Sequence, residues 1–187
     1  MTRQKLRDKA YTYLDNRRIA NVKGCEEEAV RLAQHYGADK DKASIAAILH
    51  DITKKCDYDE QLRLIRKYEI DCDEDELKCE KLLHAKTGAY LAKDKFGIDD
   101  DVFNAIAFHT TAKPDMTLLE KIIYLADYIE PTRDFEGVDQ LRKLCYENID
   151  EAMKLGLEMS LEEIESRGQI PYKDTFKAYE YYKTVNP

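Results

Sequence analysis

Helical periodicity runs through almost the whole chain and restricts its fold more than any other feature. Apolar residues recur at intervals of three and four positions, and no segment shows the sustained alternation of a β-strand. The 187 residues contain only seven glycines and four prolines, which leaves little turn chemistry for many short strands. No internal repeat and no Pro/Gly-rich linker divides the chain. The sequence therefore predicts an all-α fold with one continuous helical domain over residues 1–187.

Breaks in the periodicity set the expected helix boundaries. Gly37 and Gly97 follow helical runs as C-terminal caps, and Pro131 ends another run. Asp99 and Thr117 can cap the starts of helices. The predicted helices cover residues 3–15, 18–36, 40–53, 58–68, 74–83, 85–96, 99–109, 117–130, 138–146, 149–166 and 174–184.

Two of these segments are expected to form much of the core. The segment 40–53 is apolar in nearly every direction between Ala43 and Leu49, which predicts a buried central helix. The segment 117–130 is amphipathic, with Asp127 at the edge of its apolar stripe. The carboxylate of Asp127 is therefore expected to lie partly in the core.

Composition and charge argue against several classes of protein. The net charge of −8 and a pI near 5.1 disfavour nucleic-acid binding driven by overall charge. No apolar stretch approaches the roughly 18 residues of a membrane span, and residues 1–18 lack the apolar core of a signal peptide. The five cysteines form an odd set without a Cys-x-x-Cys pair, which is typical of reduced thiols. We therefore expect a cytoplasmic protein that binds neither nucleic acid nor membranes.

Three of the four histidines directly follow apolar helical runs. They are His50, which is followed at once by Asp51, and His84 and His109. A buried, unpaired carboxylate is costly, so Asp51 needs cations or hydrogen-bond donors nearby. Imidazole nitrogens and carboxylate oxygens that converge from several helices can bind iron, manganese, cobalt or zinc. The sequence thus predicts a divalent-metal site that includes the His50–Asp51 pair.

Each of these residues taken alone also has a purely structural interpretation. His50 can end a helix while Asp51 caps the following turn. His84 or His109 can be a satisfied core or surface histidine. Asp127 can form a buried salt bridge with a neighbouring Lys or Arg. Their occurrence together favours the metal site over these separate explanations.

The order His-Asp, His, His, Asp on successive helices resembles the HD-domain metal-dependent phosphohydrolases. The closer resemblance is to the bacterial family of symmetrical diadenosine-tetraphosphate hydrolases. The segments that carry it are residues 48–54, 82–84, 88–89 and 109–135, and weaker similarity extends from residue 18 to residue 175.

This resemblance implies a fold and a function for the chain. It implies a single HD-type phosphohydrolase domain, with a metal-site core at about 18–135 and C-terminal helices at about 138–187 that close a nucleotide pocket. It also implies cleavage of diadenosine tetraphosphate to two ADP, and it suggests a homodimer.

The resemblance further assigns roles to individual residues. The implied metal ligands are His50, Asp51 and Asp127, with iron the family's usual metal and manganese, cobalt or zinc as alternatives. The implied catalytic residues are Asp51, His84, His109 and Asp127. The residues implied to bind the nucleotide are these four and Ile52, Thr53, Lys54, Arg133, Gly168, Gln169, Ile170, Pro171, Tyr172 and Lys173. The family usually has His at the position of Tyr172.

One departure from the family lies within the segment 18–36. The family reads Arg-x-x-His followed three residues later by Gly, whereas this chain has Arg18, Asn21 and Gly24. Asn21 thus stands where the family has its first metal-binding His, and a neutral amide oxygen is a weaker ligand than imidazole. Two further hypotheses therefore accompany the diadenosine-tetraphosphate hydrolase. One is an HD-type phosphohydrolase acting on another nucleotide, and the other is a nucleotide-binding protein with impaired catalysis.

Overall fold

The computed structural model describes residues 1–185, which form eleven helices and no β-strand. The helices are α1 (Arg3–Tyr11), α2 (Asn16–Tyr36), α3 (Lys40–Leu49), α4 (Tyr58–Tyr68), α5 (Glu74–Lys78), α6 (Glu80–Phe96), α7 (Asp100–Ala107), α8 (Leu118–Ile129), α9 (Val138–Glu147), α10 (Ile149–Ser166) and α11 (Lys173–Val185). Every predicted helical segment overlaps an observed helix, with the segment 74–83 overlapping both α5 and α6, and the all-α prediction is confirmed. None of the helices within 1–185 has the length and apolar character needed to cross a membrane.

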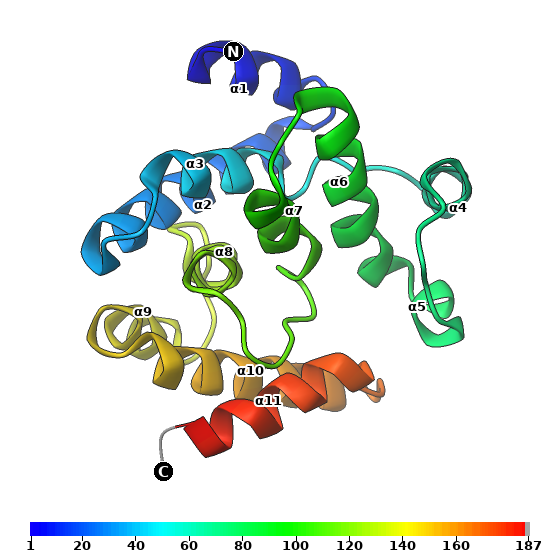
Figure 1. Ribbon diagram of the computed structural model, residues 1–187. Coiled ribbons are helices and arrows are strands. Elements are labelled where there is room, and N and C mark those ends of the chain that lie inside the picture. Colours follow the sequence, from blue (N-terminus) through cyan, green and yellow to red (C-terminus); the bar gives the residue numbers. More distant parts are fainter. Residues whose placement is uncertain (186–187) are drawn as a thin grey trace.

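α3 lies at the centre of the bundle, as its apolar composition predicts. It packs against α1, α2, α6, α7 and α8, and Figure 1 shows it beside α2 and above α8. The side chains of Ala43, Ala46, Ala47, Ile48 and Leu49 are fully buried. The C-terminus of α3 therefore delivers the residues that follow Leu49 into the interior of the protein.

α9, α10 and α11 form a layer on the α8 side of the bundle (Figure 1). α10 packs against α8, α9 and α11. Arg142 of α9 donates hydrogen bonds to the backbone carbonyls of Ile129 at 3.0 Å, Glu130 at 3.1 Å and Arg133 at 2.9 Å. The bond to Ile129 satisfies a carbonyl that the end of α8 leaves open. The bonds together hold the segment that carries Arg133 in one place.

Two helix boundaries differ from the prediction in ways that matter for the site. α3 ends at Leu49 rather than at residue 53, and residues 50–55 form successive turns. The predicted break between residues 83 and 85 is wrong, because the chain breaks at Cys79, where φ is −117° and ψ is 89°. α6 then continues without interruption to Phe96. His84 therefore lies within the first turns of α6 and not after the end of a helix.

Candidate metal centre

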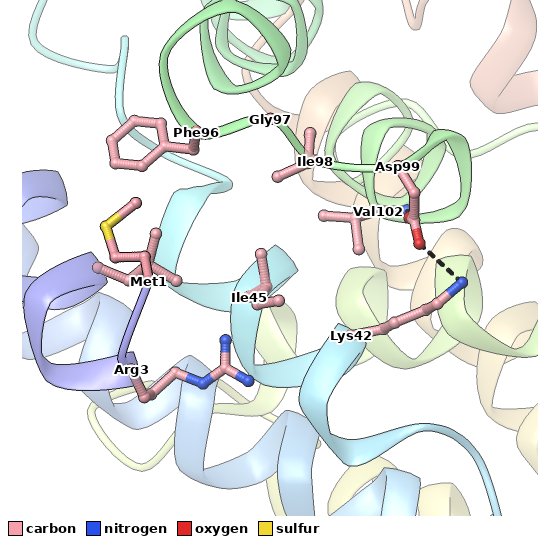
Figure 2. A pocket seen from close by; sticks show the side chains of 10 residues that line it. Met1, Arg3, Lys42, Ile45, Phe96, Gly97, Ile98, Asp99 and Val102 are labelled. Carbon is pink, nitrogen blue, oxygen red and sulfur yellow. Dashed lines mark hydrogen bonds and ion pairs between the residues drawn. The ribbon is translucent and has the colours of Figure 1, made fainter.

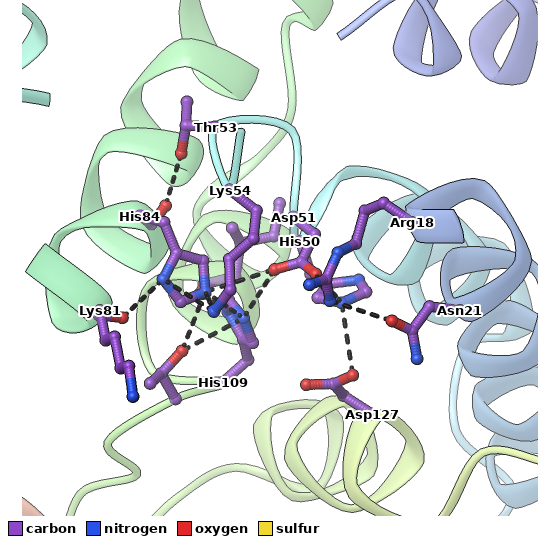
Figure 3. A network of polar contacts seen from close by, with 12 residues as sticks. Arg18, Asn21, His50, Asp51, Thr53, Lys54, Lys81, His84, His109 and Asp127 are labelled. Carbon is purple, nitrogen blue, oxygen red and sulfur yellow. Dashed lines mark hydrogen bonds and ion pairs between the residues drawn. The ribbon is translucent and has the colours of Figure 1, made fainter. Parts of the chain in front are cut away.

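Four buried side chains from separate parts of the chain meet at one point in the bundle. His50 caps the C-terminus of α3 and Asp51 follows it, while His84 lies on α6 and His109 lies in the turns after α7. His50 is 0% exposed, Asp51 and His84 are 2% exposed, and His109 is 3% exposed. Figure 3 shows their polar atoms directed toward one another, with Asp127 of α8 nearby.

The three histidines share one hydrogen-bonding arrangement. In each, Nδ1 lies close to the backbone carbonyl three residues earlier, and a carbonyl can only accept. Nδ1 therefore carries the hydrogen, and Nε2 of each neutral imidazole is left with a free lone pair directed to the centre. The distances are 2.7 Å from His50 to Ala47, 2.8 Å from His84 to Lys81 and 2.7 Å from His109 to Ile106.

The carboxylate of Asp51 lies between these imidazoles. Its Oδ1 is 3.3 Å from Nε2 of His84 and 3.7 Å from Nε2 of His109. Its Oδ2 is 3.5 Å from Nε2 of His50. The Nε2 atoms of His84 and His109 are themselves only 3.1 Å apart. Asp51 thus presents one oxygen to the α6–α7 side of the site and the other to His50.

This set of donor atoms fits a divalent metal ion. His50, Asp51 and His109 each offer one donor atom, and these atoms lie within 4.8 Å of one another. Nε2 of His50 is buried and has no hydrogen-bond partner among residues 1–185. A buried polar atom without a partner is costly, and coordination would satisfy it. Imidazole and carboxylate together suit iron, manganese, cobalt and zinc.

Asp127 approaches His50 from α8 but is also engaged elsewhere. Its Oδ1 is 3.6 Å from Nε2 of His50 and accepts a hydrogen bond of 2.8 Å from Nη2 of Arg133. Nε of Arg133 donates to the backbone carbonyl of Asp127 at 2.9 Å. Asp127 therefore forms the expected salt bridge and also lies beside His50.

Asn21 belongs to a hydrogen-bonded chain at the edge of the site. Nη1 of Arg18 donates to Oδ1 of Asn21 at 2.9 Å and to Oδ2 of Asp51 at 2.8 Å. Nδ2 of Asn21 donates to the buried carboxylate of Glu130 at 2.5 Å. Both polar atoms of the Asn21 amide thus have protein partners, and a guanidinium group lies against Asp51 on this side (Figure 3).

A lysine and a threonine border the site on its other side. Nζ of Lys54 is 3.1 Å from Nε2 of His84. The hydroxyl of Thr110 is 3.2 Å from Nε2 of His84 and 3.2 Å from Nε2 of His109. Burial lowers the pKa of Lys54. Lys54, Arg18 and Arg133 therefore place three basic side chains around one buried cluster.

The cluster shifts the pKa values of its members in different directions. Burial alone would lower the pKa of His50, but the carboxylates of Asp51 and Asp127 outweigh burial and raise it to about 10. Burial lowers the pKa of His84 to about 4, although Asp51 acts in the opposite direction. The pKa of Asp51 lies well below its usual value, because the positive charge of His50 beside it outweighs the effect of its burial. At pH 7 without metal, Asp51 is ionised and His50 holds a proton that a metal ion would displace.

The structure places two of the expected nucleotide-binding side chains away from this cluster. Ile52 is 1% exposed and belongs to the hydrophobic core. Thr53 is fully buried, and its hydroxyl donates to the backbone carbonyl of His84 at 2.8 Å. In the turn that follows His50, only Asp51 and Lys54 direct their side chains to the site.

The segment 168–173, also expected to bind the nucleotide, makes its side-chain contacts with α5 instead. The hydroxyl of Tyr172 donates to Oδ2 of Asp73 at 2.8 Å, and Nζ of Lys173 lies 2.5 Å from the same oxygen. Asp73 is the N-cap of α5. Ile170 is 94% exposed. This segment therefore links the α10–α11 turn to α5 and exposes its middle to solvent.

Sequence reasoning missed three residues that organise the site, namely Arg18, Thr110 and Glu130. Arg18 could have been found, because it lies three residues before Asn21 on the same face of a helix. Thr110 directly follows His109, but its neighbour in space, His84, is 26 residues away. Glu130 is fully buried, and no local pattern indicates the burial of a charged residue next to Pro131.

Two cavities of the protein lie away from the histidine cluster. Figure 2 shows one of about 270 Å³ that is lined by residues of α1, α3 and the turn between α6 and α7. Nζ of Lys42 pairs with Asp99 at its rim, at 2.8 Å. A second, of about 520 Å³, is lined by residues of α1 and α2. None of the predicted site residues lines either cavity, so we base the function on the histidine cluster.

Comparisons with protein families and with individual relatives agree on the family. The HD domain family matches residues 18–132. The symmetrical bis(5'-nucleosyl)-tetraphosphatase of Halalkalibacterium halodurans is 40% identical over 180 residues, with 96% of each chain covered. The protein of the same name from Bacillus subtilis is 38% identical over 169 residues, with 90% of each chain covered.

A solved structure also agrees with the fold described here. It is described as a predicted HD superfamily hydrolase involved in NAD metabolism from Clostridium acetobutylicum. It superposes with a TM-score of 0.94 at 37% sequence identity and covers 98% of both chains. The chain therefore belongs to the HD domain family and, within it, to the family of the symmetrical bis(5'-nucleosyl)-tetraphosphatases.

Proposed function

We propose that this protein is a metal-dependent phosphoanhydride hydrolase that cleaves diadenosine tetraphosphate symmetrically into two ADP. The observation that carries the proposal is the buried convergence of three imidazole Nε2 atoms on the carboxylate of Asp51, bordered by Arg18, Lys54 and Arg133. The names of the relatives in Halalkalibacterium halodurans and Bacillus subtilis support the choice of substrate.

The metal ion and the basic residues would have different roles in catalysis. A bound divalent ion supplies Lewis-acid activation of water and of a phosphoryl oxygen. Asp51 is the central ligand in this proposal, and the family resemblance adds His50 and Asp127. Iron is the proposed metal, with manganese, cobalt or zinc as alternatives.

The chain's own side chains would bind and orient the phosphates. Lys54, Arg18 and Arg133 lie where they can offset the charge of phosphoryl oxygens, which is the main requirement of this reaction. The exposed part of segment 168–173 would contact a nucleoside portion of the substrate. The C-terminal helices from residue 138 onward would close the pocket, and the remaining expectations are a homodimer and a cytoplasmic location.

Product chromatography tests this function directly. The purified protein is incubated with diadenosine tetraphosphate after reconstitution with ferrous, manganous, cobaltous or zinc ions. Symmetrical cleavage gives ADP alone, whereas asymmetrical cleavage gives AMP and ATP. The same assay with NAD and with nucleoside mono- and diphosphates tests the hypothesis of an HD-type phosphohydrolase that acts on another nucleotide. NAD is included because one structural relative is named for NAD metabolism.

The hypothesis of a nucleotide-binding protein with impaired catalysis requires a binding measurement. A catalytically impaired protein would bind ADP in a calorimetric titration and release no product with any of the four metals. Metal analysis of the purified protein identifies the ion, and light scattering measures the oligomeric state. Absence of turnover on every substrate, together with ADP binding, would contradict the proposed hydrolase.

A further inference from the structure

Two imidazoles that the resemblance assigns to the substrate are arranged as metal ligands. Nε2 of His84 and Nε2 of His109 are 3.1 Å apart. Both rings donate through Nδ1 to backbone carbonyls, so neither neutral ring has a hydrogen to place between the two Nε2 atoms. Two lone pairs at this distance repel each other unless a cation or a shared donor lies between them.

The distances within this group match the ligand shell of one ion. Oδ1 of Asp51 completes a triangle with the two nitrogens, and its sides are 3.1, 3.3 and 3.7 Å. Ligands at about 2.1 Å from an ion are about 3.0 Å apart in octahedral geometry and about 3.4 Å apart in tetrahedral geometry. Two histidines and one carboxylate on one face of an ion form a recurrent site for ferrous iron.

The opposite face of Asp51 is less suited to a dication in this chain. Oδ2 of Asp51 already accepts a hydrogen bond from Arg18 at 2.8 Å, and Oδ1 of Asp127 accepts one from Arg133 at 2.8 Å. A metal ion there would lie close to two guanidinium groups that are always charged. Asn21, in place of the family's imidazole, adds no negative charge and is bonded to Arg18 and Glu130.

Among residues 1–185, no arginine contacts the α6–α7 face. The donors near its nitrogens within residues 1–185 are the Thr110 hydroxyl, 3.2 Å from both, and the Lys54 ammonium, 3.1 Å from His84. Thr110 has one hydroxyl hydrogen and can serve only one of the two nitrogens at a time. Lys54 has a flexible side chain and can withdraw from His84 toward a substrate phosphate.

We propose that in this protein His84, His109 and Oδ1 of Asp51 hold the divalent ion. The inference rests on the metal dependence proposed above and changes the expected ligand set. His50 remains next to this position, because its donor atom lies within 4.8 Å of those of Asp51 and His109. The loss of imidazole at residue 21 is thereby offset by two imidazoles from the other side of Asp51.

Nitrogen NMR of the wild-type protein tests the ligand set without an activity assay. The chain has only four histidines, so a long-range ¹H–¹⁵N spectrum can resolve every imidazole. Zinc is the probe, because it is diamagnetic and binds imidazole. After one equivalent of zinc we expect the Nε2 resonances of His84 and His109 to shift, whereas exposed His35 serves as the internal control and stays in place.

Affinity measurements on matched variants supply a second readout. His84→Gln and His109→Gln are each expected to weaken zinc binding by at least about tenfold, because loss of a ligand costs no less affinity than loss of a supporting group. His35→Gln is expected to bind zinc as the wild type does. Circular dichroism confirms that each variant is folded, and the wild-type spectrum decides the question if one of them is not.

The outcomes separate this inference from the proposed function. A shift of His50 alone, with His84 and His109 unchanged, would overturn the inference and leave the metal-dependent hydrolase standing. Unchanged resonances for all four histidines would overturn both. Shifts of His84 and His109 support the inference whether or not His50 shifts with them.

Discussion

The carboxylate of Glu130 lies directly against Gly24 and joins α2 to the end of α8. A Cβ atom on residue 24 would be 2.6 Å from Oε2 of Glu130 and 3.1 Å from Cδ of Pro131. Glu130 is fully buried and is held by Asn21 and by the backbone and hydroxyl of Thr132. It cannot withdraw without breaking those bonds, so the close approach requires glycine at residue 24.

We therefore expect Gly24→Ala to destabilise the protein by about 1–3 kcal/mol, the usual cost of overpacking a core. Urea unfolding measures the change. The matched control is Gly156→Ala in α10, where a Cβ atom would meet its nearest neighbours at 3.6 Å, an ordinary contact. A Gly24→Ala protein as stable as the control would show that Glu130 moves freely.

The stability of the metal-free protein is expected to depend on pH through His50. Its pKa is about 10 in the folded state, above the unfolded value of about 6.5. A raised pKa contributes stability that is fully present below pH 6.5 and is lost as the pH rises through 10. Urea midpoints in the presence of a chelator should therefore fall between pH 7 and 10. Free cysteine thiols also titrate in this range, so the comparison with His50→Gln, which is expected to flatten the profile, isolates the contribution of His50.

His84 is expected to change the stability of the protein at acidic pH. Its folded pKa of about 4 lies below the unfolded value of about 6.5, because burial favours the neutral ring. The unfolded chain binds the proton more readily, so stability falls as the pH drops from about 6.5 toward 4. Comparison of His84→Gln with wild type over this range isolates the contribution. Parallel curves for the two proteins would contradict the assigned protonation state.

Much of the fold could be predicted because its signals are local. The apolar run from Ala43 to Leu49 predicts the buried central helix, and α3 occupies that place. Residues that follow such a helix are delivered to the interior, which is why His50 and Asp51 stood out in the sequence. The break at Cys79 could not be predicted, because neither Gly nor Pro marks it and the preceding five-residue helix has no apolar periodicity of its own.

The details of the site depend on contacts that the sequence does not encode locally. The hydrogen bond from Asn21 to Glu130 joins residues 109 positions apart in the sequence, and the hydrogen bond from Tyr172 to Asp73 joins residues 99 positions apart. Spacing on a helix could place Asn21 near a metal, but it could not show that both atoms of its amide are already bonded. The ring orientations of His84 and His109 likewise follow from backbone carbonyls and not from residue type.

The contact of Tyr172 with Asp73 leads to a prediction about substrate binding. Tyr172→Phe removes only the hydroxyl that bonds Asp73 and should loosen the segment 168–173. If this segment contacts the nucleotide, KM for diadenosine tetraphosphate rises by about threefold to tenfold, as expected for the loss of one hydrogen bond to a charged group, while kcat changes little. Tyr179→Phe is the matched control, because its hydroxyl bonds a carboxylate of Glu158 on the same layer. Equal KM values for the two variants would show that segment 168–173 does not contact the substrate.

Asp51 is the residue that the metal site cannot lose. Its two oxygens face the imidazoles on both sides, so Asp51→Ala removes the one carboxylate within residues 1–185 that contacts all three of them. We expect the variant to retain no metal after dialysis and to hydrolyse diadenosine tetraphosphate at least about 100-fold more slowly, because ligand loss is more severe than loss of a supporting group. The exposed Asp139→Ala is the control. Full metal content and turnover in Asp51→Ala would make Asp51 structural and contradict the proposed site.

The Asn21→His variant tests how the replacement of the family's His by Asn21 changes metal affinity. Asn21 lies next to Arg18, whose guanidinium holds Oδ2 of Asp51. An imidazole at residue 21 would add a nitrogen ligand on this side and would remove the amide oxygen that helps to hold Arg18 there. This face of Asp51 lies opposite the ion position proposed above, so the new imidazole would create metal affinity there in addition to that of His84 and His109. We therefore expect zinc and ferrous affinity, measured by calorimetry under anaerobic conditions, to rise by about tenfold or more. Asn21→Gln keeps the amide without adding imidazole and should show no such gain. Equal affinities in wild type and Asn21→His would mean that residue 21 does not reach the ion, and that Arg18 keeps Oδ2 of Asp51 closed to metal whichever side chain stands beside it.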